Sequence, residues 1–380
     1  MPWRNWMIKK QAYTVELRGT NYEIGRDFGE FTKENPALRA VHTAGFDHFD
    51  EAEAKKAAEL FDRWCPGLAE ELQGFADALE VKPSQIVYYA MTYLRPRCSQ
   101  IAVLPGISAS GNPLLARNYE FSPDAEDFTL VKTSVTGKYV HLGTSVLHFG
   151  RDDGFNECGL AVTMSSCGFP VGALPYMRNP KLTGLQFWAV IRALLENCKD
   201  VPEALDYMKD MPIAFNMNLM LVDKSGRAAL AETLDGRMAV KQIDRSSADQ
   251  LLYATNHPLL PELVPYEPQA MRNSLQRYEL IGRSLQGKGK ITEDDLKQLL
   301  LEKFPAGLSC PYYEDFFGTT KSMIMNPAKG TVELCWGGRS ENGWHRYDIR
   351  EPLADSVLDI ELQAEAAYPE FFESVPISAN

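Results

Sequence analysis

Several kinds of sequence feature are missing from this chain. It has seven cysteines, an odd number, and no two of them have Cys-x-x-Cys spacing. This pattern fits neither a zinc ribbon nor a disulfide framework, and it indicates a reducing compartment. No apolar run reaches the roughly 18 residues of a membrane-spanning helix, and the first residues lack the apolar core of a signal peptide. The sequence therefore predicts a cytoplasmic protein that makes no membrane contact.

Positive charge and metal-binding spacing are also scarce. The chain has 39 Lys and Arg against 51 Asp and Glu, a net charge of −12, so it repels phosphate backbones and we expect no nucleic-acid partner. Its six histidines show no His-Glu-x-x-His or similar spacing, so we expect no metal. Residues 282–288 imitate a phosphate-binding loop, but Gly289 stands where that loop needs Ser or Thr. We expect no cofactor.

What the sequence does contain is a large apolar fraction arranged with two different periods. Hydrophobic residues make up 45% of the 380 positions, which is enough for a sizeable core. Residues 1–97 are expected to be mainly helical after one short strand near 13–17, with helices in 36–64, in 67–80 and from 83 onward. Strands are then expected near 101–104, 113–121, 128–135, 138–147, 151–156, 159–166, 217–223, 227–233, 238–243, 251–255, 319–326 and 330–336. Further helices are expected at 184–197, 200–210, 268–285 and 292–303.

Runs of strands alternating with runs of helices predict an α+β fold, with two antiparallel sheets and helices outside them. The change of period near residue 98 divides the chain into a helical segment, 1–97, and a larger domain, 98–380.

Cys98 stands where the helical segment ends and the strands begin. A cysteine nucleophile needs a base, orienting charges and a donor for the oxyanion. Arg117 and Glu120 lie on the expected partner strand of the same hairpin. Asn256 follows a strand at a polar turn, and Arg277 lies on the helix just beyond. A lone cysteine is more often a small buried apolar residue, but this combination favours a catalytic one.

This set of residues, in this order, resembles the N-terminal-nucleophile hydrolases of the choloylglycine hydrolase and penicillin V acylase type. It is most similar to the autoproteolytic branch that includes isopenicillin N acyltransferase. The resemblance covers nearly the whole chain, and it also rests on residues 18–25, 66–76, 223–226 and 319–336.

The resemblance implies a four-layer αββα sandwich with a helical N-terminal pro-segment. It implies that the nucleophile is Cys98, which is exposed when the chain cleaves its own Arg97–Cys98 bond. Arg117 matches the family's strand arginine. Glu120 matches the carboxylate beside the nucleophile's α-amine, where most relatives have Asp.

The remaining matches concern the oxyanion and its support. Asn256 matches the oxyanion asparagine, and Arg277 matches the helix arginine that supports the site. The second oxyanion position falls near Ser166, where bile-salt hydrolases carry Asn and penicillin V acylases carry Tyr. Serine at this position implies neither of those substrates.

We therefore predict an autoproteolytically activated cysteine amidohydrolase or acyltransferase. It would act on linear amide C–N bonds of a small-molecule acyl amide, through a thioester on Cys98. The α-amino group of a cut Cys98 can be the base, because its reference pKa is about 7.7–8.0. Residues 1–97 would cover the site until cleavage and then remain as a bound partner. The acyl and amine groups stay open, and so does a homo-oligomer.

Two alternatives remain open at this point. The first is a papain-like hydrolase that pairs Cys98 with His257 and does not cleave itself. The second is a binding protein that retains the fold without catalysis. It draws weight from Arg97, because the residue before the cysteine is often Gly in the acyltransferases.

Overall fold

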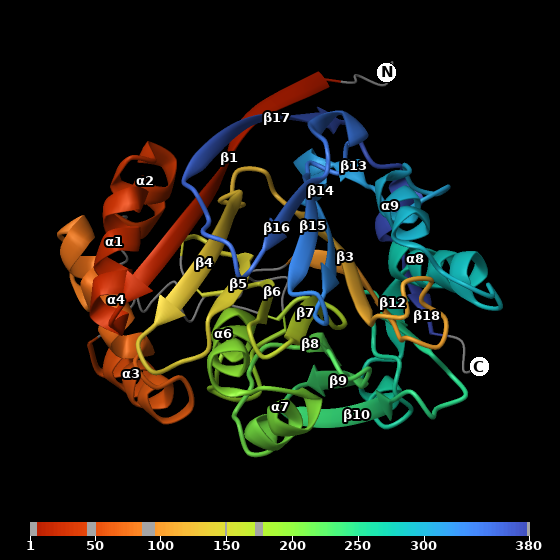
Figure 1. Cartoon of the computed structure of the whole chain (residues 1–380), viewed down its shortest axis with the longest axis horizontal. Helices are drawn as coiled ribbons and strands as arrows, with labels where there is room; N and C mark the ends of the chain where they lie inside the picture. Colours follow the sequence, from red (N-terminus) through yellow and green to blue (C-terminus); the bar gives the residue numbers. More distant parts are fainter. Residues whose placement is uncertain (1–5, 44–50, 86–95, 149, 172–177, 378–380) are drawn as a thin grey trace.

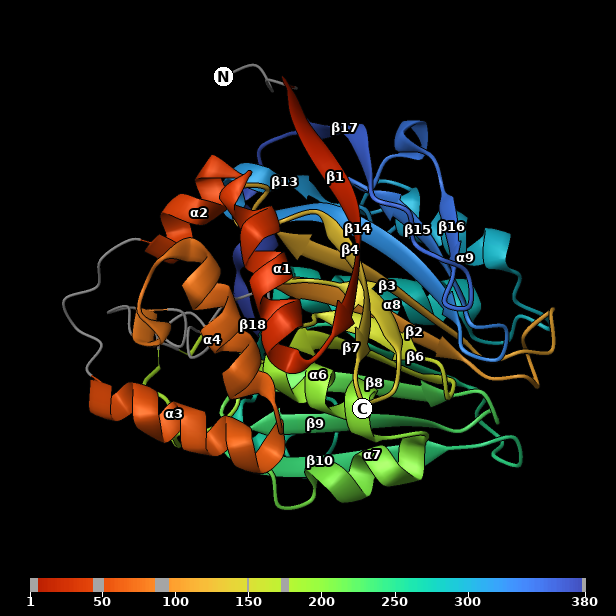
Figure 2. The same cartoon turned by 60° about the vertical axis from the view of Figure 1, so that its left-hand side comes forward.

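A computed structural model of the chain describes residues 6–43, 51–85, 96–148, 150–171 and 178–377 (Figure 1). Two large sheets pack face to face, with helices on both outer faces (Figures 1 and 2). The predicted α+β class and the four-layer αββα arrangement are therefore confirmed. The helix expected from residue 83 begins there, but residues 86–95 lie outside the described parts.

One sheet has nine strands in the order β10-β9-β8-β7-β6-β5-β4-β1-β17. Its strands are β1 (Trp6–Gly19), β4 (Thr129–Val135), β5 (His141–Thr144), β6 (Asp153–Asn156), β7 (Leu160–Ser166), β8 (Met217–Asp223), β9 (Ala228–Leu234), β10 (Arg237–Ile243) and β17 (Ser356–Ala364).

The second sheet has seven strands in the order β11-β2-β3-β14-β15-β16, with β13 also paired to β14. Its strands are β2 (Arg97–Val103), β3 (Leu114–Phe121), β11 (Leu251–Ala254), β13 (Pro311–Tyr312), β14 (Phe317–Asn326), β15 (Thr331–Trp336) and β16 (His345–Asp348). A small separate sheet pairs β12 (Gln269–Met271) with β18 (Ser374–Pro376).

Helices cover the outer faces of the two large sheets. On the nine-stranded sheet these are α1 (Asn21–Lys33), α2 (Pro36–Thr43), α3 (Glu51–Trp64), α4 (Leu68–Leu79), α6 (Phe187–Asn197) and α7 (Val201–Met208). On the seven-stranded sheet they are α8 (Arg272–Leu285) and α9 (Glu293–Leu301). None of the helices in the described parts of the chain is long and apolar enough to cross a membrane.

The two-residue period of β2 and β3 decides which side chains face which layer. Ala102 and Leu115 pack between the two sheets. Ile101 and Ala116, one residue away, pack against α8 and α9. The polar side chains further along β2 and β3 follow the same alternation. Each of them therefore points either into the space between the two sheets or toward the layer of α8 and α9.

The N-terminal strand differs most from expectation. β1 is 14 residues long and lies inside the nine-stranded sheet, parallel to β4 and antiparallel to β17. The sequence predicted only a short strand near 13–17 and purely antiparallel sheets. The first half of β1 alternates half-buried and exposed side chains, including Lys9, so its apolar period is weak. The helices expected within 36–64 and 67–80 are present as α2, α3 and α4, and α1 precedes them.

Buried polar contacts also join the N-terminal segment to the rest of the chain. Glu71 on α4 accepts two hydrogen bonds from Arg192 on α6, at 2.9 and 2.5 Å. Arg192 also donates to Glu196 at 2.6 Å, and all three side chains are buried. Thr32 on α1 contacts the ring of His148 at 2.9 Å.

We expect Arg192→Met to destabilise the chain by about 3–5 kcal/mol, because it removes the cation that Glu71 binds and one of the cations that Glu196 binds. Urea unfolding followed by circular dichroism measures this change. Lys82→Met removes one partner of the exposed Lys82–Glu51 pair and serves as the control, with an expected change within about 1 kcal/mol. Equal losses of stability in the two variants would show that the buried cluster contributes no more to stability than an exposed ion pair.

Candidate active site

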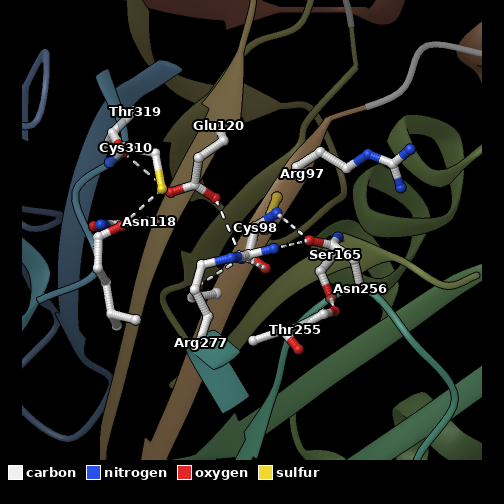
Figure 3. A network of polar contacts seen from close by, with 12 residues as sticks. Arg97, Cys98, Asn118, Glu120, Ser165, Thr255, Asn256, Arg277, Cys310 and Thr319 are labelled. Atoms are coloured by element: carbon white, nitrogen blue, oxygen red, sulfur yellow. Dashed lines mark hydrogen bonds and ion pairs between the residues drawn. The ribbon is translucent and has the colours of Figure 1, made fainter. Parts of the chain in front are cut away.

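Cys98 is the second residue of β2, and side chains bind three of its atoms. Figure 3 shows two of the binding residues, Asn256 and Arg277. Its fully buried Sγ accepts a hydrogen bond from Nη2 of Arg117 at 2.9 Å. Its backbone N–H donates to Oδ1 of Asn256 at 3.3 Å. Its carbonyl oxygen accepts from Nη1 of Arg277 at 2.9 Å. Residues far apart in the sequence thus meet at one cysteine.

Arg117 lies on β3 and points into the space between the two sheets. Its Nη1 donates to the backbone oxygen of Asp152 at 2.7 Å and to Oδ2 of Asp153 at 3.0 Å. Its Nη2 also donates to the backbone oxygen of Met164 at 3.1 Å. A planar guanidinium with this many acceptors has little freedom to turn, so it stays directed at the thiol.

A buried network of charges continues beyond Arg117. Nζ of Lys321 on β14 is 2.7 Å from Oδ2 of Asp152 and 3.1 Å from both carboxylate oxygens of Glu126. Both cations lie over the ring of Tyr119, the Arg117 guanidinium at 4.6 Å and Nζ of Lys321 at 4.2 Å from its centre. Burial raises the pKa of Asp152 to about 8, although Lys321 opposes this. In this network the carboxylates and the cations near Arg117 balance one another.

These supporting residues were not found from the sequence. One signal was available, because Lys321 stands within a strand whose side chains are otherwise apolar or small and polar. A lysine in such a strand requires buried carboxylates nearby. The sequence does not show which ones, since Glu126 and Asp152 belong to other segments.

Glu120 points to the opposite face of β3 from Arg117. Its Oε1 accepts a hydrogen bond from Oγ1 of Thr319 at 3.2 Å, and its Oε2 is 3.8 Å from Nη1 of Arg277 (Figure 3). Burial raises the pKa of Glu120 to about 7, against the opposing effects of Arg277 and Thr319. In the uncut chain the N–H of Cys98 bonds to Asn256, so the predicted role of Glu120 beside the α-amine stays a prediction.

The amide of Asn256 has a defined orientation. Its Oδ1 accepts from the Cys98 N–H and from Nη2 of Arg277, at 2.6 Å for the latter. Its Nδ2 therefore faces Ser166 and donates to the backbone oxygen and to Oγ of that residue, at 3.0 and 3.1 Å. Nη1 of Arg97 also donates to Oγ of Ser166, at 3.3 Å. The structure brings together all seven residues named from the sequence.

The Cys98 thiol is protonated at neutral pH in the uncut chain. Burial raises its pKa to about 12, and Arg117 only partly offsets this effect. A thiol is a weak nucleophile compared with its thiolate, so the site needs a base.

His257 does not act as that base in this arrangement. Its Nδ1 is 2.8 Å from Oγ of Ser274, and its ring packs edge-on against Tyr278 at 5.5 Å. Burial lowers its pKa to about 3. No hydrogen bond joins it to Cys98 among the residues that the structure describes. The Cys–His pair of the papain-like alternative is therefore not formed.

No group of three or more His, Cys, Asp or Glu side chains in the described parts of the chain could bind a metal ion.

The Glu120 pKa gives a stability prediction for uncut Cys98→Ala protein. Because the folded pKa of about 7 lies above the ordinary 4.5, stability should fall as pH rises between these values. The loss should be about 2–3 kcal/mol. Asp152 and Glu232 also have raised pKa values, so adding Glu120→Gln should remove only the Glu120 part of the loss in urea unfolding at both ends of the range. The exposed Glu279→Gln is the control and should leave it unchanged. The same pH slope with and without Glu120 would contradict the assignment.

Comparisons with solved structures find low similarity. A variant of the conjugated bile acid hydrolase from Clostridium perfringens is 13% identical, with a TM-score of 0.43, over 71% of this chain and 99% of the hydrolase. Penicillin V acylase from Agrobacterium tumefaciens is 18% identical, with a TM-score of 0.40, over 63% of this chain and 83% of the acylase. Similarity at this level says nothing about individual site residues.

Comparisons of sequence are more informative. An uncharacterized protein from Archaeoglobus fulgidus is 21% identical over 91% of this chain and 67% of its own length. The model of the family described as acyl-coenzyme A:6-aminopenicillanic acid acyl-transferase matches residues 108–341, more than half of the chain. This match includes Arg117, Glu120, Asn256 and Arg277 but begins after Cys98. The chain belongs to that family, as its resemblance to the acyltransferase branch predicted.

Proposed function

We propose that this chain is a cysteine enzyme that cleaves its own Arg97–Cys98 bond and then hydrolyses or transfers the acyl group of a linear amide. The observation that carries the proposal is the set of contacts at Cys98. Arg117 binds its Sγ, Asn256 binds its N–H and Arg277 binds its carbonyl oxygen. Polar contacts to all three of these atoms are more than a buried structural cysteine needs.

The self-cleavage would begin at the thiol. Sγ of Cys98 loses its proton and attacks the carbonyl carbon of Arg97. The C–N bond then breaks, the nitrogen of Cys98 takes up a proton, and a thioester joins Arg97 to Sγ. Water hydrolyses the thioester, which leaves a carboxylate on Arg97 and a free α-amine and thiol on Cys98.

The same groups would then act on an external amide. The new α-amine has a reference pKa of about 7.7–8.0, so it can accept the thiol proton near neutral pH, from its own residue. Arg117 stabilises the thiolate. The substrate oxygen, once negatively charged, takes the Nδ2 donor of Asn256 in place of Ser166. The α-ammonium returns its proton to the leaving amine, and water or a second nucleophile resolves the thioester.

Glu120 and Arg277 would balance the charge that cleavage creates. Glu120 lies across from Arg97 in the β2–β3 register, next to the bond that is cut. A new ammonium at Cys98 would lower the Glu120 pKa from its value of about 7 in the uncut chain. The longer Glu, compared with Asp in most relatives, can reach this position from the far face of the sheet.

Residues 1–97 would remain bound after the cut as a separate subunit. β1 has a strand on each side, and Glu71 pairs with Arg192 in the interior. Removing the segment would expose both neighbouring strands and leave Arg192 with one partner fewer. This supports the predicted division at residue 98 as a division between polypeptides rather than between separate folding units.

The acyl-enzyme is the direct test of the proposed chemistry. Purified protein is mixed with a set of N-acyl p-nitroanilides, and p-nitroaniline release is followed while intact mass reports the thioester. We expect one acyl adduct, on the peptide that begins with Cys98, and no adduct in Cys98→Ser. Cys310→Ser removes another buried cysteine and should keep the adduct. An unmodified Cys98 with every anilide, in protein that is already cut, would refute the function.

Asn256→Ala tests the oxyanion contact. Losing this donor should lower kcat by about 100- to 1000-fold, with little change in KM, because the contact forms in the transition state. Steady-state kinetics on the fastest anilide gives both constants. Asn197→Ala, which removes an amide that bonds within α6, is the control and should keep kcat. Similar kcat values in the two variants would exclude Asn256 from the oxyanion site.

A further inference from the structure

Arg97 lies against the catalytic residues and is itself bound by the rest of the fold. It is only 8% exposed. Its Nη1 donates to Oγ of Ser166 at 3.3 Å and to the backbone oxygen of Gly168 at 3.4 Å. In Figure 3 its side chain extends away from Glu120 and Arg277. It forms part of the wall of a hollow that is also lined by Ser166, Gly168, Phe169, Pro170, Phe215 and Asn216.

The charged groups described around this hollow are mainly acidic. Glu267 lies directly behind Gly168, where its Oε2 would be 3.1 Å from an added Cβ. Asp235 accepts a hydrogen bond from Nδ2 of Asn216 at 3.1 Å. Both carboxylates pair with Arg178, at 3.0 and 3.2 Å. Two carboxylates therefore share one guanidinium, and Arg97 supplies a second positive charge near them.

The chemistry of self-cleavage relates the position of the Arg97 side chain to the position of a substrate. The thioester of self-cleavage joins Sγ of Cys98 to the carbonyl carbon of Arg97. An acyl-enzyme from an external amide joins the same Sγ to the carbonyl carbon of the substrate. In both, the acyl side group is attached to the carbonyl carbon that is bonded to Sγ of Cys98. The Arg97 side chain therefore marks where a substrate's acyl side group lies.

We propose that the acyl subsite is the place of the Arg97 side chain together with the hollow that it lines, and that this subsite takes acyl groups ending in a cationic hydrogen-bond donor at the reach of an arginine side chain. The proposal rests on the proposed function, because it concerns the acyl-enzyme at Cys98. Before cleavage Arg97 fills the subsite as its first occupant. After hydrolysis of its thioester Arg97 ends in a carboxylate, and its departure from the hollow opens the subsite to an amide with a guanidinium or ammonium group.

Three p-nitroanilides that differ in one group test the subsite on cut enzyme: those of N-acetylarginine, N-acetylcitrulline and N-acetylnorleucine. Citrulline retains the donors without the charge, and norleucine lacks both. We expect kcat/KM to fall by about tenfold or more from arginine to citrulline, and to fall again to norleucine. Glu267→Gln should bring the arginine-to-citrulline ratio toward one. The exposed Glu262→Gln is the control and should leave the ratio unchanged.

A second measurement needs no external substrate. Full-length chain made by cell-free synthesis is followed by intact mass while it cleaves itself. Arg97→Lys should cleave at close to the wild-type rate, whereas Arg97→Gln and Arg97→Leu should be slower by about tenfold or more. Circular dichroism and the urea midpoint establish that each variant is folded.

The outcomes separate the two proposals. Acylation of Cys98 that is as fast with norleucine as with arginine overturns the subsite and leaves the proposed function intact. Equal self-cleavage rates in Arg97→Leu and Arg97→Lys also overturn the subsite. A chain that is neither cut nor acylated by any of the three anilides overturns both.

Discussion

A guanidinium buried between two sheets is the constraint on which the rest of this structure depends. Arg117 is fully buried, and a buried charge is tolerated only with matched partners. Asp153 and the backbone oxygens of Asp152 and Met164 accept its hydrogen bonds, and Lys321 balances the neighbouring carboxylates. The thiol of Cys98 accepts one hydrogen bond from this cation. The inner faces of both sheets are therefore shaped around one arginine and the sulfur beside it.

The period of the strands separates the charges of the site onto two faces. Arg117 and the Cys98 thiol face the inner layer, whereas Glu120 and Arg277 meet on the face that carries α8. The backbone nitrogen of Cys98 lies in the sheet between the two faces and already has a polar partner, Asn256. This makes cleavage at that nitrogen chemically useful, because a base formed there is next to the nucleophile without any additional side chain.

The sequence was sufficient to predict the β2–β3 hairpin and many of the residues that meet at Cys98. The alternation in β2 and β3 fixes a register in which Cys98 is opposite Tyr119, and this brings Arg117 to the same face as the thiol. The supporting charges depend on how two sheets stack, and no local pattern encodes the distance from Lys321 to Asp152. β1 was underestimated because a half-exposed strand with lysines has little apolar period. β17, its neighbour, was missed although Leu358, Ile360 and Leu362 alternate with polar residues.

The account depends most on one peptide bond, and N-terminal sequencing of the purified chain tests that bond most directly. The account predicts a second N-terminus that reads Cys98-Ser-Gln-Ile, in equal amount with a fragment that ends at Arg97. It also predicts that this second N-terminus is absent from Cys98→Ala protein. A single uncut chain of 42.6 kDa, with the Arg97–Cys98 peptide intact after folding, would contradict the account.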